Sequence, residues 1–86
     1  MGFHDFRSQS PLTALPLGAS GTVADIKVSA ASRARLMEMG LLMGTSVELV
    51  RFAPMGDPVE IKVRGYNLTL RKQEADQILV KVNPAS

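Results

Sequence analysis

Alternation of apolar and polar side chains runs through most of this 86-residue chain, and a period of two is typical of half-buried β-strands. The clearest case is residues 59–64, VEIKVR, and an earlier case is residues 22–28, TVADIKV. The residues predicted to face inward are Val59, Ile61 and Val63 in the first segment and Ala24, Ile26 and Val28 in the second. The same pattern predicts further strands at residues 46–52, 68–71 and 78–82.

A helical period interrupts the strands at residues 29–40, SAASRARLMEMG. Leu36 and Met37 fall on one face of a short helix of about two turns. Ser29 or Ser32 can cap its N-terminus. Gly40 suits the left-handed residue that ends a helix.

Glycine, proline and aspartate mark the connections between the predicted strands. The predicted turn and loop residues are Gly40, Gly44, Pro54, Gly56, Asp57, Pro58 and Gly65. In the loop 53–58, APMGDP, Pro58 favours an extended Asp57, whose carboxylate can accept hydrogen bonds from nearby backbone N–H groups. Residues 65–67 are predicted as a hairpin turn. Turn geometry explains each of these residues. It does not explain Met55, an apolar residue near the tip of the same loop.

These elements predict a mainly β fold: a small, SH3-like, partly open barrel of about five strands with one short helix. A chain of this length suits one domain. We expect that domain at residues 11–83, with a flexible N-terminal tail at 1–10 and a C-terminal tail at 84–86. Residues 72–77, KQEADQ, are expected to add a single helical turn.

The residue types available argue against catalysis. The chain has no cysteine, which excludes a disulfide scaffold, a zinc ribbon and a thiol nucleophile. Its single histidine, His4, lies with Asp5 in the N-terminal stretch and cannot provide the ligands of a structural metal site. We therefore predict no catalytic residues, no metal site and no cofactor. No apolar run approaches the roughly 20 residues that span a bilayer, so we expect a cytoplasmic protein without direct membrane insertion.

Nucleic-acid binding is the main alternative, because small barrels serve that function and the net charge is +2. A basic patch could draw on Arg33, Arg35, Arg51, Lys62, Arg64, Arg71 and Lys72. Single-strand binders usually interleave aromatic residues as stacking platforms, however, and this chain has one tyrosine and no tryptophan. A nucleic-acid-binding or regulatory barrel stays as the alternative, and nucleic acid is not the expected partner.

Residues 35–80 carry a more specific pattern. In order along the chain they contain Met39-Gly40, Leu41-Leu42, Gly44-Thr45, Ala53-Pro54, Gly56-Asp57-Pro58 and Leu70-Arg71. This succession resembles the FeoA family of ferrous iron transport accessory proteins. Met43 stands where the family usually has proline, and Met55 stands where it usually has leucine.

The resemblance implies an SH3-like barrel without catalytic activity, which binds the cytoplasmic GTP-binding region of the membrane iron transporter FeoB. The expected contacts with that partner are the apolar residues Leu42, Met43 and Met55 and the polar residues Arg35 and Arg71. We also expect Arg71 to pair with a carboxylate, that of Asp57 or Glu74, or with loop carbonyls, because it ends a strand directly before an acidic turn. Unpaired barrel edges would permit weak self-association.

Overall fold

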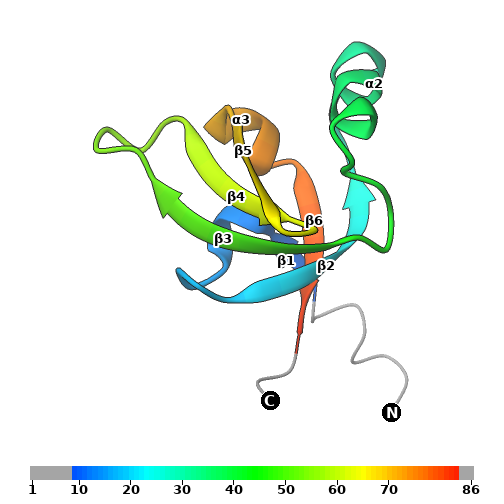
Figure 1. Ribbon diagram of the computed structural model, residues 1–86. Coiled ribbons are helices and arrows are strands. Elements are labelled where there is room, and N and C mark those ends of the chain that lie inside the picture. Colours follow the sequence, from blue (N-terminus) through cyan, green and yellow to red (C-terminus); the bar gives the residue numbers. More distant parts are fainter. Residues whose placement is uncertain (1–8, 84–86) are drawn as a thin grey trace.

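One antiparallel sheet organises residues 9–83, the part of the chain that the computed structural model describes (Figure 1). The elements in chain order are β1 (Gln9–Pro11), the 3₁₀ helix η1 (Leu12–Ala14), β2 (Ser20–Ile26), α2 (Ala30–Glu38), β3 (Ser46–Phe52), β4 (Val59–Val63), β5 (Tyr66–Leu70), α3 (Lys72–Ala75) and β6 (Ile78–Val82). The six strands follow the order β1-β6-β2-β3-β4-β5. The prediction of a mainly β fold with one short helix is confirmed, with β1 as an additional strand.

The sheet curls around a core formed by the inward side of every long strand (Figure 1). Val59, Ile61 and Val63 are all buried, as their alternation with charged residues predicts. The predicted helical turn is present as α3, whose Ala75 is also buried. The helix α2 contributes only Leu36 to this core, although Met37 was expected to share the buried face.

A β-bulge in β2 changes the inward face that the alternation predicts for this strand. Val23 pairs with Val80 and Asp25 pairs with Leu79, so the register shifts between them. A bulge inserts one residue opposite the partner strand and breaks the period of two. Val23 is therefore buried and Ala24 is only half-buried, in contrast to the prediction. Ile26 and Val28 are buried, as predicted.

The hairpin between β4 and β5 turns earlier than predicted. Its two turn residues are Arg64 and Gly65, with φ values of 52° and 90°. Positive φ at both positions is the geometry of a type I′ turn, which matches the twist of the flanking strands. Tyr66 and Asn67, expected in the turn, instead pair with β4.

The N-terminal stretch enters the sheet sooner than the sequence indicates. Gln9 and Ser10, assigned to the tail at 1–10, pair with Lys81 and Val80 of β6. Residues 1–8 and the predicted C-terminal tail at 84–86 lie outside the described residues.

The helix α2 stands beside the sheet rather than across its face (Figure 1). Ser29 caps its N-terminus by accepting a hydrogen bond from the Ser32 backbone N–H at 3.4 Å. Ser29 is one of the two residues predicted as the cap. A nine-residue helix is marginal on its own, so its position depends on tertiary contacts. One such contact is the Arg33 guanidinium, which donates to the Ile26 carbonyl at 2.5 Å.

Candidate partner-binding surface

A Schellman motif ends α2 and decides which residues of the α2–β3 connection are buried. The Gly40 N–H donates to the Met37 carbonyl, and the Leu41 N–H donates to the Leu36 carbonyl, each at 3.0 Å. Gly40 has a φ of 97°, a conformation that glycine adopts without steric cost. Leu36 and Leu41 are both fully buried, which is the apolar contact that often accompanies this motif.

The next residues form a tight turn that holds two apolar side chains in solvent. The Thr45 N–H donates to the Leu42 carbonyl at 3.0 Å, and Gly44 at the third position has a φ of 85°. These features are those of a type II turn. Val23 of β2 anchors the turn through hydrogen bonds of 2.8 Å with Gly44 and Thr45. Leu42 is 39% exposed and Met43 is 61% exposed.

Tyr66 of β5 closes the other side of this region. Its hydroxyl donates to the Met39 carbonyl at 2.5 Å, and its side chain is 43% exposed. An added Cβ at Gly40 would lie 2.4 Å from that hydroxyl oxygen, so glycine is needed for the close approach. Met37, on the last turn of α2, is 49% exposed. We refer to Met37, Leu42, Met43 and Tyr66 together as the turn surface.

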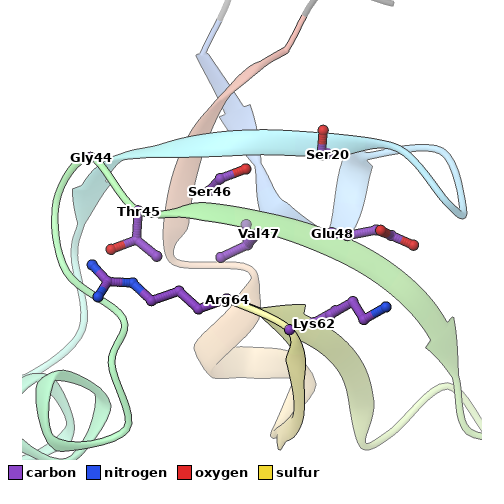
Figure 2. Close-up of a pocket in the computed structure, with 9 residues that line it drawn as sticks. Ser20, Gly44, Thr45, Ser46, Val47, Glu48, Lys62 and Arg64 are labelled. Carbon is purple, nitrogen blue, oxygen red and sulfur yellow. The ribbon is translucent and has the colours of Figure 1, made fainter.

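A shallow groove of about 530 Å³ adjoins the turn surface (Figure 2). Gly44 and Thr45 form one end of it, and Lys62 and Arg64 supply two cations from β4 and the hairpin turn. Figure 2 shows the Arg64 side chain extending toward Thr45. Glu48 is the one carboxylate in the lining, so the groove is more positive than negative.

Met55 is not part of this surface, although it was predicted to act together with Leu42 and Met43. It is 94% exposed in the β3–β4 loop, at the opposite end of β3 from the α2–β3 turn (Figure 1). A strand of seven residues separates the two regions by roughly 20 Å. The three residues therefore cannot form one small apolar cleft.

The predicted loop 53–58 is a compact turn next to α3. The Gly56 N–H donates to the Ala53 carbonyl at 2.7 Å. The Asp57 carboxylate accepts a hydrogen bond of 3.0 Å from the Lys72 backbone N–H, which confirms its predicted role as an acceptor. Gly56 has a positive φ of 88°, and the Asp57-Pro58 peptide bond is cis. Asp57 thus attaches this loop to the first turn of α3.

Arg35 reaches from α2 to α3 and forms an ion pair with Glu74. Glu74 is only 6% exposed, and its Oε1 has no hydrogen-bond partner among the described residues. The hydrogen bond from Arg35 lowers the pKa of Glu74, and burial of the carboxylate opposes that effect. Arg35 is therefore engaged in holding α2 in place.

Arg71 forms neither of the ion pairs predicted for it. Across residues 9–83 its guanidinium has no carboxylate within 4.0 Å, and it donates no hydrogen bond to a loop carbonyl, the other partner predicted for it. The physical reason is that both expected partners are occupied, because Glu74 pairs with Arg35 and Asp57 accepts from the Lys72 backbone. Arg71 remains exposed at the end of β5.

Metal-ligand clusters and membrane-spanning helices are both absent from residues 9–83. No three or more side chains of His, Cys, Asp and Glu come close enough there to hold a metal ion. None of the helices in that range is both long and apolar enough to cross a membrane. His4, the single histidine of the sequence, lies outside the described residues.

A family model for the FeoA domain matches residues 10–82. The chain belongs to the FeoA family. A fusion protein of Fe(2+) transport protein A and the Fe(2+) transporter FeoB, from Porphyromonas gingivalis, is 31% identical over 71 residues. That match covers 83% of this chain, and the chain spans 8% of the length of that relative.

Solved FeoA structures share this fold. FeoA from Chlorobium tepidum is 37% identical with a TM-score of 0.82, over 88% of this chain and 72% of that one. FeoA from Stenotrophomonas maltophilia, an SH3-domain protein in complex with zinc, is 32% identical with a TM-score of 0.65, over 81% and 87% of the two chains. The predicted SH3-like fold and the resemblance to FeoA are both confirmed.

Within this FeoA domain, sequence reasoning found part of the turn surface. Leu42 and Met43 are among the apolar contacts that the resemblance to FeoA implied. Tyr66 was missed because it was placed in the hairpin turn. The two-residue spacing from Arg64-Gly65 could have placed it at the start of β5, since two-residue turns are the commonest hairpin connections.

Proposed function

We propose that this FeoA chain is a non-enzymatic, cytoplasmic accessory protein of ferrous iron transport that binds the GTP-binding region of a FeoB-type transporter and modulates it. The observation that carries the proposal is the Porphyromonas gingivalis relative, in which a related segment and FeoB form one polypeptide. Fusion raises the effective concentration of one domain near the other. Chains related to the first part of such a fusion are expected to act through the same contact.

The turn surface is the proposed contact. Large apolar side chains exposed together on a small domain indicate a binding surface. Methionine adapts to irregular partner surfaces because its side chain is unbranched and flexible. The hydrogen bonds of the turn to β2 keep Leu42 and Met43 in place before binding, which reduces the entropy lost on association. Lys62 and Arg64 in the adjoining groove would guide the approach of an acidic partner surface.

The carboxylates support a role without catalysis. General acid–base catalysis favours a carboxyl group whose pKa is raised toward neutrality. Here neighbouring donors lower the pKa values of the three carboxyl groups Glu60, Glu74 and Asp76. The donors are Asn67 and Arg51 for Glu60, Arg35 for Glu74, and Thr13 and Lys72 for Asp76. Each of these groups thus has a structural partner.

Co-purification tests the proposal. The tagged chain would be incubated with the detergent-solubilised FeoB-type transporter of the same organism, with GDP or a non-hydrolysable GTP analogue. We expect the wild-type chain to retain the transporter and the double variant Leu42→Ser/Met43→Ser to lose most of it. Met55→Ser is the matched control, because it removes an even more exposed methionine at the far end of β3.

Each outcome bears on a separate part of the proposal. Failure of the wild-type chain to retain the transporter with either nucleotide would remove the proposed partnership. Retention by the double variant, with circular dichroism showing that it is folded, would remove the turn surface as the contact. A stronger loss with Met55→Ser would move the contact to the β3–β4 loop.

A further inference from the structure

The strand β5 is an edge of the sheet without the usual protection against further pairing. Natural edge strands are commonly blocked by charged side chains, proline, bulges or very short length. β5, with the sequence YNLTL, has no charged residue and no proline, and it pairs with β4 in continuous register over five residues. The opposite edge, β1, has only three residues and ends in Pro11.

The hairpin geometry shows which backbone groups this edge offers. In a two-residue hairpin the closing pair, here Val63 and Tyr66, exchanges both backbone hydrogen bonds, and the pairs alternate from there. Asn67 and Thr69 consequently direct their backbone N–H and C=O groups away from β4. No hydrogen bond outside the sheet involves these backbone groups in the described residues. Both residues are exposed.

A groove lies directly beside this edge, between β5, α2 and α3. It has a volume of about 530 Å³ and is lined by Ser32, Arg35, Pro58, Thr69, Leu70, Arg71 and Glu74. Its two guanidinium groups face one carboxylate, and that carboxylate already pairs with Arg35. The lining therefore carries one net positive charge, and Arg71, at the C-terminal end of the open edge, is the cation without a carboxylate within 4.0 Å in the described residues.

We propose that the β5 edge binds an extended acidic segment of a partner protein by strand addition. The segment would pair with the backbone of Asn67 and Thr69, and a carboxylate of the segment would bind Arg71. Strand addition obtains affinity from main-chain hydrogen bonds and specificity from side chains beside the strand. The charge of the groove selects an acidic segment over a basic one. This interface uses the backbone of Asn67 and Thr69 and none of the turn-surface side chains, although Tyr66 of that surface begins the same strand. Its test requires no transporter.

The probe is a capped synthetic peptide of about ten residues in which valine and glutamate alternate, a length that strand addition readily accommodates. A peptide of alternating valine and lysine is its control. Amide hydrogen exchange of the full chain, read residue by residue by NMR, reports whether Asn67 and Thr69 become protected. We expect both amides to exchange rapidly in the free protein and about tenfold more slowly with the glutamate peptide.

Two pairs of variants test the mechanism by fluorescence anisotropy of the labelled glutamate peptide. Thr69→Pro removes an N–H that points away from β4, so the β4–β5 ladder stays intact, and binding should weaken at least about tenfold. Thr69→Val keeps the N–H and should bind as the wild type does. Arg71→Glu should weaken binding by about tenfold, whereas Lys81→Glu on β6 should change it less than about twofold.

Three results would overturn the proposal. The first is the absence of any peptide-dependent protection at Asn67 and Thr69, or their protection in dilute free protein. The second is equal binding of the lysine and glutamate peptides. The third is protection that rises with protein concentration alone, which would assign the edge to a second copy of this chain.

Discussion

Replacing Gly40 by alanine would destabilise the backbone that supports the turn surface in two ways. The first is conformational, because a left-handed backbone such as the φ of 97° at Gly40 costs an L-residue about 1–2 kcal/mol. The second is steric, because the new Cβ would lie 2.4 Å from the Tyr66 hydroxyl oxygen. Tyr66 must then move and lose its hydrogen bond to Met39, which is worth about 1 kcal/mol. The free energy of unfolding should fall by about 2–3 kcal/mol.

The variant Tyr66→Phe separates the two costs. It removes the clashing oxygen, and the next ring atom, Cζ, would be 3.8 Å from the new Cβ, an ordinary contact. In the Tyr66→Phe background, Gly40→Ala should therefore cost only the conformational part, about 1–2 kcal/mol. Gly44→Ala is a control for that part alone, because Gly44 has a φ of 85° and an added Cβ would meet nothing within 4 Å.

Urea denaturation of the wild type, the two single variants and the double variant gives the coupling energy. We expect the double variant to be more stable than the sum of the single effects predicts, by about 1 kcal/mol or more. Effects that add to within about 0.3–0.5 kcal/mol would refute the contact between Tyr66 and the end of α2. A cost of Gly44→Ala equal to that of Gly40→Ala would refute the steric part.

Three further predictions concern the ion pair and the turn. The pKa of Glu74 is lowered in the folded state, so its ion pair stabilises the protein at pH values above its usual pKa of 4.5. That stabilisation is lost as the pH falls through the pKa of the folded state. Glu74→Gln should therefore flatten the acid side of a plot of thermal midpoint against pH. Arg35→Ala should lower the thermal midpoint at pH 7, since it leaves a buried carboxylate unpaired, whereas Arg71→Ala should change stability by less than about 0.5 kcal/mol in urea titrations. Met43→Pro should raise the free energy of unfolding by about 0.4–1 kcal/mol in the same titrations, because proline suits the second position of a type II turn and the Met43 N–H has no acceptor in residues 9–83.

The sequence predicted the inward face correctly in β4, a strand that contains no bulge of its own. Val59, Ile61 and Val63 alternate with polar residues, and β4 pairs with β5 without a shift, so the inward face follows from the period of two. The pattern failed at Val23 and Ala24 of β2, because the bulge between Val23 and Asp25 depends on how this strand meets β6. No local residue preference reports such a tertiary constraint.

The ion pairs likewise depend on contacts between residues that are far apart in the sequence. The expectation for Arg71 rested on its position at the end of a strand, directly before the acidic turn that contains Glu74. The actual partner of Glu74 is Arg35, 39 residues away, which the fold of α2 against α3 brings close. Such a pairing cannot be obtained from one sequence, because it depends on where α2 comes to lie in the folded chain.

The turn surface connects the family motif with the proposed function. Gly40 turns the chain so that Leu41 enters the core, and Gly44 closes the turn that leaves Leu42 and Met43 exposed. A partner that contacts these two side chains therefore depends on backbone conformations that other residues adopt only at a cost. The loop 53–58 is attached to the first turn of α3 by the hydrogen bond between Asp57 and the Lys72 backbone. Met55 in that loop is exposed at the far end of β3, away from Leu42 and Met43. The glycine-led turn after α2, rather than the proline-rich loop, is thus the part of the motif that combines a rigid backbone with neighbouring apolar side chains.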